Sequence, residues 1–253
     1  MRIAVAGGTG VVGRHVVEAL TADGHESVVL ARSTGVDLAA GTGLDAALDG
    51  TDAVIDVSNV VTMKAQASVQ WFEAATTHLL AAAHRAAVGH VVALSIVGAH
   101  RVDLGYYLGK RRQEELLLAA DAPVPTSVLR ATQFHEFAGQ LLQRMGGPIA
   151  LIPAMRSQPV AAREVGVALV KLAIVPAVGL APELAGPQPE LMADLVRRQL
   201  RAIGSRRRVL QVRLPGRTGK QAASGGLLPT EPGPRGVQTF DEWLHSQDGP
   251  APW

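Results

Sequence analysis

Three glycines near the start of the chain are the residues best suited to hold a ligand. Gly7, Gly10 and Gly13 give a G-x-x-G-x-x-G motif that follows an expected strand and opens an expected helix. Glycine tolerates the positive φ of a tight turn, and without a Cβ it lets a diphosphate reach the free amides of the helix start. The context predicts a dinucleotide-binding turn rather than a turn without a ligand. Its residues are Gly7, Gly8, Thr9, Gly10, Val11, Val12 and Gly13.

A second group of residues could transfer a proton. Tyr106 and Lys110 form Y-x-x-x-K, and positions i and i+4 share one side of a helix. An ammonium beside a phenol lowers the pKa of the phenol, which can then exchange a proton with a carbonyl oxygen as hydride moves. Ser95, at the end of an expected strand, could bind the same oxygen. Tyr107 could act in place of Tyr106. The alternative is a packed aromatic and a solvated lysine that pairs with Glu114.

The residues after the second expected strand bear on the choice of dinucleotide. No carboxylate stands where the ribose diol of NAD would be held; the chain has Arg32 and Ser33 there instead. A planar cation suits a 2′-phosphate. We therefore expect NADP(H) as the preferred cofactor, with NAD(H) possible. The alternative is that Arg32 is a solvated loop residue.

Alternating strands and helices must position these residues. Strands are expected at 2–6, 27–31, near residue 37, 53–57, 90–95 and 126–130, and helices at 11–22, 44–48, 68–87 and 106–120. This alternation of strands and helices predicts parallel strands joined by crossover helices. Further on we expect helices at 134–145, 164–173, 190–202 and 239–245, a strand at 209–214 and a loop at 216–236. The predicted class is α/β: a Rossmann-type doubly wound parallel sheet in one domain, 1–253, with a core at 1–132 and a small C-terminal substrate lobe at about 133–253.

Composition narrows the class of protein. The chain has 253 residues, a net charge of +2 and no cysteine, which excludes disulfides and thiolate metal sites. The histidines are scattered, so no metal site is expected. Nearly neutral charge, with neither a signal peptide nor an unbroken apolar span, predicts a cytoplasmic protein without nucleic-acid or membrane partners. The basic cluster Arg197, Arg198, Arg201, Arg206, Arg207 and Arg208 is interpreted as a solvated helix end rather than a partner site.

The glycine motif resembles that of the short-chain dehydrogenase/reductase superfamily. With SIVG at 95–98, LRATQF at 129–134 and ELAGP at 183–187, the chain is similar to the atypical, NmrA-like NAD(P)H-binding branch. The resemblance implies that Ser95, Tyr106 and Lys110 form the catalytic set and that Lys110 also binds the nicotinamide ribose. It further implies that Asp37 and Leu38 lie near the adenine, and that Val57, Ser58 and Asn59 line the adenosine side. For Asp37 the alternative is an acid that forms a turn.

The segment after the expected strand at 126–130 should face the nicotinamide. Thr132, Gln133, Phe134 and His135 are therefore candidates for substrate binding, and Phe137, Met155 and Gln158 are candidates for closing the pocket. His135 could be a second acid or base, although a lone histidine is more often packed or solvated.

The expected function is that of an NADPH-dependent oxidoreductase. It would transfer hydride to or from a small carbonyl, quinone or related conjugated substrate. The main alternative is an NmrA-type redox sensor that binds NADP(H) without turnover, and the Y-x-x-x-K pattern favours the enzyme. An epimerase that uses bound cofactor is less favoured, because such enzymes usually have a larger C-terminal domain. The substrate, the direction of reaction and the oligomeric state are left open.

Overall fold

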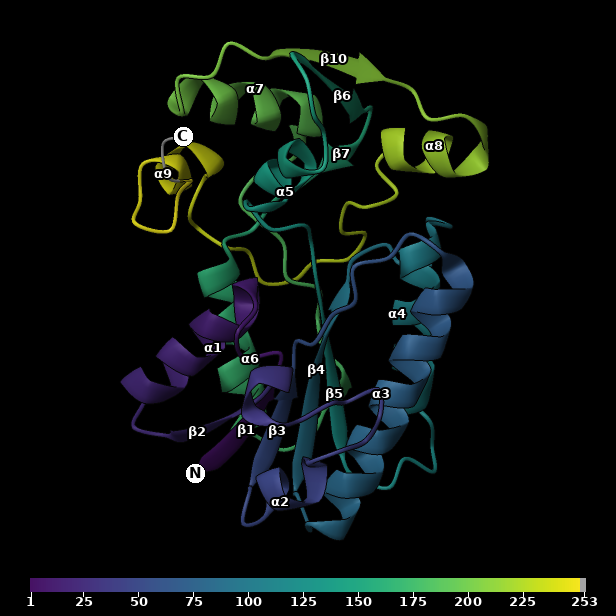
Figure 1. The fold of residues 1–253 in the computed structure, drawn as a ribbon, viewed down its shortest axis with the longest axis vertical. Coiled ribbons are helices and arrows are strands. Elements are labelled where there is room, and N and C mark those ends of the chain that lie inside the picture. Colours follow the sequence, from purple (N-terminus) through teal and green to yellow (C-terminus); the bar gives the residue numbers. More distant parts are fainter. Residues whose placement is uncertain (251–253) are drawn as a thin grey trace.

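The structure, a computed structural model, describes residues 1–250. Figure 1 shows a central sheet flanked by helices, with a smaller lobe over one end of the sheet. The lobe lies at the carboxyl ends of the parallel strands, where open α/β sheets bind ligands.

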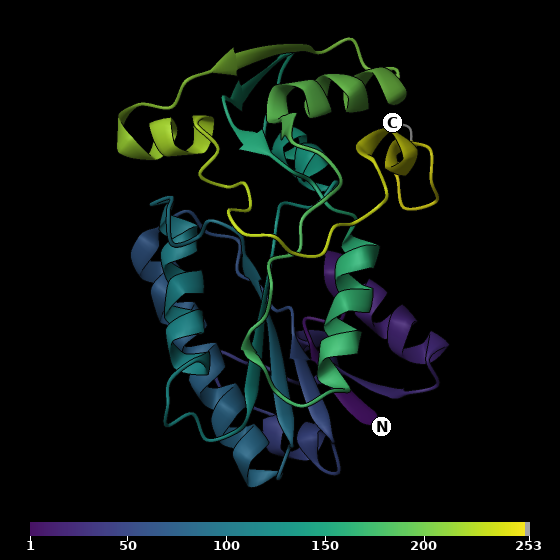
Figure 2. The ribbon, with the colours of Figure 1, turned by 180° about the vertical axis from the view of Figure 1, so that it is seen from behind.

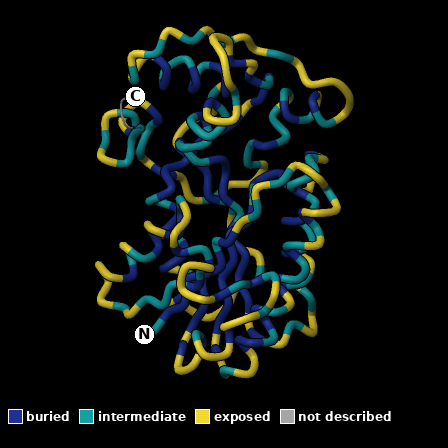
Figure 3. Tube along the Cα trace, viewed as in Figure 1, coloured by how far each residue is buried: buried dark blue, intermediate teal, exposed yellow. Residues whose placement is uncertain are grey.

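The central sheet contains six parallel strands. In spatial order they are β2 (Glu26–Leu30), β1 (Arg2–Ala6), β3 (Ala53–Asp56), β4 (His90–Ile96), β5 (Thr126–Ala131) and β8 (Gly179–Leu180). The inner strands are apolar, because helices cover both faces of the sheet. Figure 3 shows these strands as buried. This confirms the predicted α/β class. The strand order reverses at β1, so a crevice is expected between the carboxyl ends of β1 and β3.

Helices cover the two faces of this sheet unequally. One face packs on α1 (Val11–Ala22) and α6 (Ala162–Ala173) through a core that contains Val5, Ile55 and Val92. The other face packs on α2 (Leu44–Leu48), α3 (Ala65–Arg85) and α4 (Gly105–Leu117). Figure 2 shows the two layers from behind. The helix starts of α1 and α4 both point toward the end of the sheet that carries the lobe.

The lobe has an apolar core of its own, which includes Ile152, Leu195, Phe240 and Trp243. Its two small sheets pair β6 with β10 in parallel and β7 with β9 antiparallel. Its elements are α5 (Phe137–Gln143), β6 (Ile149–Pro153), β7 (Arg156–Ser157), β9 (Glu190–Leu191), α7 (Met192–Ala202), β10 (Arg208–Val212), α8 (Gly216–Ala223) and α9 (Phe240–Leu244).

Three expected features of the chain differ in the structure. No strand forms near Asp37: a 3₁₀ turn, η1 (Arg32–Thr34), and a single bridge between Asp37 and Thr42 stand there, because the Asp37 carboxylate binds the amides that follow it. The expected loop at 216–236 begins with α8. Residues after 132 do not all enter the lobe, since α6 and β8 return to the central sheet.

Candidate functional site

The glycine turn has no room for side chains at two of its three motif positions. Gly7 has a φ of +79°, and a Cβ added there would lie 2.9 Å from the Cα of Ser58. A Cβ on Gly13 would lie 2.1 Å from the carbonyl oxygen of Gly7, so α1 begins directly against the turn. The contacts bring the backbone of the turn against the end of β3. A backbone without side chains is what the close approach of a diphosphate requires.

The start of α1 is open to a ligand. Its N-cap, Gly10, makes no side-chain capping bond, and the first turn holds no acidic residue. Thr9 and Gly10 are exposed, Val11 is half-buried, and Val12 is buried against the sheet. The first amides of a helix lack internal acceptors and carry the positive end of its dipole. These residues therefore fit the diphosphate of a dinucleotide.

Tyr106 joins this region through the end of β3. Ser58 lies against Gly7, and its buried hydroxyl makes no hydrogen bond within the described residues. The next residue, Asn59, is exposed and accepts a 2.7 Å hydrogen bond at Oδ1 from the Tyr106 hydroxyl. Val57, which precedes them, is half-buried. The structure thus brings the candidate proton donor to the strand end that borders the glycine turn.

Lys110 is turned into the protein rather than toward that phenol. Only 4% of the residue is exposed. Its Nζ donates to the carbonyl oxygen of Leu94 at 2.8 Å and to Oε1 of Gln113 at 2.7 Å, and it lies 4.6 Å from the ring centroid of Phe72. Gln113 Nε2 donates in turn to Oδ2 of Asp56 at 2.8 Å. The amide of Gln113 therefore links a buried cation to a buried anion.

The pKa values of this pair follow from burial. Burial raises the pKa of Tyr106 above its ordinary value, and the nearby Tyr107 and Asp56 raise it further. Burial lowers the pKa of Lys110 to about 8, against the opposing effect of Asp56 and Glu114. The expectation that Lys110 lowers the pKa of Tyr106 is wrong for this arrangement, because a carbonyl and an amide hold the ammonium. A phenol with a raised pKa stays protonated near neutral pH and can donate a proton.

The second tyrosine has different surroundings. Tyr107 is 7% exposed and belongs to the apolar core of the lobe. Burial raises its pKa to about 12, although the Gln133 side chain that faces it acts in the opposite direction. Its ring contacts that of Tyr106 edge-on, with centroids 5.9 Å apart. The two phenols therefore face different elements: Tyr106 faces the end of β3, and Tyr107 faces the connection into the lobe.

Ser95 is bound to a carboxylate. Its Oγ donates to Oε1 of Glu114 at 2.5 Å, and Glu114 also forms an ion pair with Arg130, with Nη2 and Oε2 2.5 Å apart. Glu114 thus pairs with Arg130 and not, as the solvated alternative supposed, with Lys110. Neither Ser95 nor Lys110 has a hydrogen bond to Tyr106 within residues 1–250. The structure places the three predicted catalytic residues on neighbouring elements without joining them.

The candidates for cofactor selectivity differ in accessibility. Arg32 and Ser33 stand exposed in η1, directly after β2, and neither side chain makes a hydrogen bond or ion pair in the described part of the chain. Asp37 uses Oδ1 to accept hydrogen bonds from the amides of Ala39 and Ala40. Leu38 is buried in the core under α3. The bonds of Asp37 are those of a turn-forming acid, whereas Arg32 is free to bind an anion.

The candidates for substrate binding are mostly engaged inside the protein. The Thr132 hydroxyl donates to the carbonyl oxygen of Gln158 at 2.6 Å, and Gln133 Oε1 accepts from Ser157 at 2.8 Å. Phe134 is half-buried against the core of the central sheet. Among them, Gln133 keeps a buried Nε2 without a partner in the described residues and faces Tyr107.

His135 is held in an aromatic cluster where the chain passes from the central sheet into the lobe. It is 1% exposed, its Nε2 lies 3.1 Å from the carbonyl oxygen of Gln238, and its ring centroid is 5.6 Å from those of Phe240 and Trp243. Burial lowers its pKa to about 4. These contacts are those of a packed, neutral histidine. Of the pocket-closing candidates, Phe137 and Met155 pack in the lobe core, and Gln158 Nε2 bonds to Gly186.

Sequence reasoning missed three ionisable or polar residues of this region. Gln113 lies at i+3 from Lys110, a spacing that could have indicated their contact, and Asp56 ends an expected strand. Glu136 follows His135, and both of its carboxylate oxygens are buried without a hydrogen bond in the described chain. Burial raises the pKa of Glu136 to about 7. No local pattern indicates that burial, because it depends on α9.

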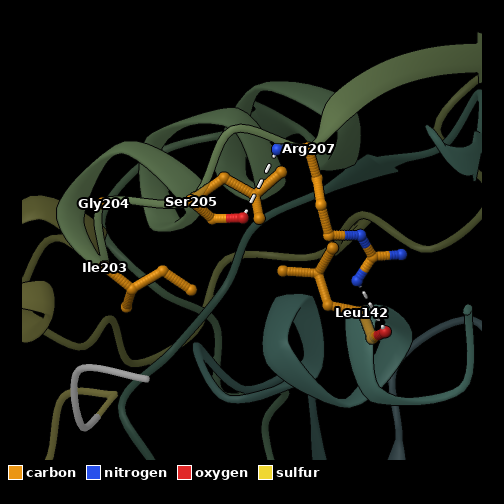
Figure 4. A pocket seen from close by; sticks show the side chains of 6 residues that line it. Leu142, Ile203, Gly204, Ser205 and Arg207 are labelled. Atoms are coloured by element: carbon orange, nitrogen blue, oxygen red, sulfur yellow. Dashed lines mark hydrogen bonds between the residues drawn. The ribbon is translucent and has the colours of Figure 1, made fainter. Parts of the chain in front are cut away.

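A hollow of about 330 Å³ lies in the lobe, away from the glycine turn. It is lined by Leu142, Leu200, Ile203, Gly204, Ser205 and Arg207 (Figure 4). The guanidinium of Arg207 donates to the carbonyl oxygens of Leu142 and Met145 at the end of α5. Within residues 1–250, no three His, Asp or Glu side chains gather as a metal site would need. No described helix has the length and apolarity to cross a bilayer.

Comparison with known proteins supports a dinucleotide-binding fold. Residues 3–99 match the model of the NAD dependent epimerase/dehydratase family. No curated protein matches the chain. Among solved structures, MoeE5 in complex with UDP-glucuronic acid and NAD is 20% identical over 98% of each chain, with a TM-score of 0.75.

Two further structures have the same fold. The UDP-glucose 4-epimerase of Thermus thermophilus, in complex with NAD, is 19% identical over 96% of this chain and 98% of that one, with a TM-score of 0.69. A short-chain dehydrogenase/reductase superfamily protein from Agrobacterium tumefaciens with bound NAD is 20% identical over 97% and 95%, with a TM-score of 0.69. Residues 3–99 are therefore similar to the NAD dependent epimerase/dehydratase family, and the solved structures share the fold of the whole chain. Membership of the narrower NmrA-like branch stays a prediction.

Proposed function

We propose that the protein is an NADP(H)-dependent oxidoreductase that transfers hydride to or from a small carbonyl, quinone or related conjugated compound. The observation that carries the proposal is the open start of α1 beside the glycine turn. Gly7 of that turn lies against Ser58, one residue before the Asn59 that binds Tyr106. When bound, the nicotinamide supplies or accepts the hydride. The protein's part is to hold the diphosphate, orient the substrate and provide a proton.

The dinucleotide would be bound along the carboxyl ends of β1, β2 and β3. Residues 7–13 would hold the diphosphate, Val57, Ser58 and Asn59 would line the adenosine side, and Asp37 and Leu38 would lie near the adenine. NADP(H) is preferred in this proposal because Arg32, exposed and without a partner in the described chain, can bind a 2′-phosphate. The NAD-bound relatives support a nicotinamide dinucleotide in general. The preference for the phosphorylated form depends on Arg32 alone.

Tyr106 would donate the proton as hydride reaches the substrate. Its pKa is raised, so the phenol is protonated near neutral pH, the form that a proton donor needs, and it is a weaker acid than an ordinary phenol. Lys110 and Ser95 would complete the site only after exchanging their present partners. Lys110 must leave Gln113 and the carbonyl of Leu94 to reach a ribose, and Ser95 must leave Glu114 to reach a carbonyl oxygen.

The lobe would provide the substrate side. We propose that residues beyond 132, apart from α6 and β8, act as the substrate lobe, with Gln133 as its polar contact. Gln133 has an unpartnered Nε2 in the described chain and faces Tyr107, whereas Thr132, Phe134 and His135 would act mainly by holding the connection in place.

A second candidate function is epimerisation of a sugar nucleotide with a tightly bound cofactor. The family model matched by residues 3–99 and the complexes of MoeE5 with sugar nucleotides favour it. The expectation that a larger C-terminal domain would be needed is not supported, because the match spans 98% of the Thermus enzyme. An epimerase returns its cofactor to the starting state, so it would show no net oxidation of NADPH.

Titration and turnover together separate these functions. Fluorescence titration with NADPH and NADH tests binding, and a screen of quinones, ketones and imines tests net oxidation of NADPH. Tyr106→Phe should abolish turnover while binding persists, and Tyr107→Phe, which removes the neighbouring phenol, is the matched control. Binding without net oxidation of NADPH would favour the redox sensor or the epimerase over the reductase, and interconversion of a sugar nucleotide by the protein would then separate these two alternatives. Absence of any dinucleotide binding would refute the proposal.

A further inference from the structure

The small net charge of the chain conceals a strong segregation of charge. Residues 195–230 hold nine of the 24 Lys and Arg residues and no Asp or Glu, so the rest of the chain holds 15 cations against 22 acids. Three of the nine are engaged internally. Arg197 pairs with Asp194, Arg198 pairs with Glu190 and Asp241, and Arg207 binds the end of α5.

The other six cations are free to meet a partner. Their side chains are exposed and make no hydrogen bond or ion pair within residues 1–250: Arg201, Arg206, Arg208, Arg213, Arg217 and Lys220. They lie on the end of α7, on and around β10, and on α8. Figures 1 and 2 show these elements at the end of the molecule that is farthest from the central sheet.

The same end of the molecule carries an uncovered sheet face. In the β6–β10 pair, Ala150 and Ile152 are fully buried on the inner side toward α7. On the outer side Ile149, Leu151 and Leu210 are 49%, 50% and 56% exposed, and the register sets Leu151 beside Leu210. Parallel strands normally have both faces covered. Here the apolar side chains of Ile149, Leu151 and Leu210 are exposed to solvent and are surrounded by arginines.

A cationic hollow lies beside this face. It measures about 380 Å³ and is lined by Arg197, Leu200, Arg201, Ser205, Arg207, Arg208 and Val209, with no carboxylate among the lining residues. It adjoins the hollow of Figure 4, with which it shares Leu200, Ser205 and Arg207. Guanidinium groups around a hollow of this kind suit a phosphate.

We propose that this basic face, formed by β6, β10 and the six free cations, docks on an anionic phospholipid surface. The apolar side chains of Ile149, Leu151 and Leu210 would enter the interface between head groups and acyl chains, while the surrounding cations pair with phosphates. A second copy bound through the same face would set the six free cations against another six. Residues 195–230 contain no aromatic side chain on which a base could stack, which argues against single-stranded nucleic acid.

Sedimentation of the full chain with vesicles tests the proposal. Vesicles of phosphatidylcholine alone are compared with vesicles that also contain phosphatidylserine or phosphatidylglycerol, at low and high salt. We expect binding only to the anionic vesicles, with loss at high salt. The triple variant R208E/R213E/R217E should lower partitioning by at least roughly a hundredfold, since each cation near an anionic surface contributes about a fivefold factor. Leu210→Ser should also weaken it.

Two controls make the result specific. The double variant R85E/K171E changes the charge of exposed residues on α3 and α6 and should bind as the wild type does. Circular dichroism shows whether each variant is folded. Absence of partitioning by the folded wild type, or an equal loss in the control variant, would overturn the proposal. Binding of polyglutamate without binding of vesicles would also overturn it, because it would assign the face to an acidic protein. Loss of vesicle binding on addition of inorganic phosphate at low concentration would overturn it too, because it would assign the hollow to a soluble anion.

Discussion

The ammonium of Lys110 donates a 2.7 Å hydrogen bond to Oε1 of Gln113, and the other end of the same amide donates to Asp56. All three residues are almost fully buried. A charge in such surroundings is costly unless it is paired, and the cost grows sharply when one partner is removed. Both Lys110 and Gln113 lie on α4, and their further bonds to the carbonyl oxygen of Leu94 on β4 and to Asp56 on β3 stabilise the position of that helix over the sheet.

Replacing Gln113 should reveal this contribution. Gln113→Leu leaves Lys110 with one acceptor and leaves an oxygen of Asp56 without its donor, which should lower the free energy of unfolding by about 2–4 kcal/mol. Urea denaturation measures the change. Gln66→Leu, on the exposed side of α3, is the control and should stay within about 0.5 kcal/mol of the wild type. An equal effect of both substitutions would show that the buried network contributes nothing.

The buried lysine should also make stability depend on pH. Its pKa falls from 10.5 in the unfolded chain to about 8 in the folded protein, so the unfolded state binds more protons between these values. The wild type should therefore gain stability relative to Lys110→Met as the pH rises from 8 to 10.5, by about 3 kcal/mol. Denaturation of both proteins at pH 7.5 and pH 10 measures this difference. A constant difference would mean that Lys110 keeps its ordinary pKa.

Glu136 should give the stability a pH dependence opposite in sign to that of Lys110, and in a lower pH range. Burial raises its pKa from 4.5 to about 7, so the folded state binds the extra proton and stability falls as the pH rises through this interval. Glu136→Gln imitates the protonated acid. At pH 8 it should be more stable than the wild type by about 3 kcal/mol, and at pH 4.5 the two should agree. A destabilised variant at pH 8 would show that the carboxylate has a partner when charged.

His135, next to Glu136, should also make the stability of the protein depend on pH. The pKa of His135 falls from 6.5 to about 4 on folding, so its contribution to stability is present above pH 6.5 and is lost as the pH falls toward 4. His135→Phe should remove that part of the acid sensitivity if the ring is neutral and packed. Thermal unfolding of the variant and the wild type at pH 7 and pH 4.5 would detect it. An unchanged acid transition would contradict the packed histidine.

Features of the molecule that depend on residues close together in the chain were predictable from the sequence. The glycine turn, the order of strands and helices to residue 131 and the exposed Arg32 depend on neighbours in the chain. The orientation of Lys110 was not predictable, because its ammonium binds the carbonyl oxygen of Leu94 on another element and a Gln113 side chain that is itself bound to Asp56, 57 residues earlier. The packing of His135 depends on Gln238, 103 residues later. The expected strand near Asp37 failed because side-chain bonds to the backbone compete with strand pairing.

Gly13 should be intolerant of any side chain. A Cβ would meet backbone atoms of the turn at 2.1 and 2.6 Å, and backbone cannot yield as a flexible side chain can. Gly13→Ala should displace the start of α1 and weaken NADPH binding at least tenfold. Gly146→Ala, where a Cβ would meet nothing within 4 Å, is the matched control and should bind normally. Normal binding by Gly13→Ala would remove the turn from the cofactor site.

The most direct test of the dinucleotide site is the dissociation constant of the wild type for NADPH and for NADH, with the same pair of titrations on Arg32→Ala. We expect that both dinucleotides bind, that NADPH binds more tightly, and that Arg32→Ala loses roughly tenfold for NADPH with little change for NADH. If neither dinucleotide binds, the start of α1 is not a diphosphate site and the proposed function is contradicted.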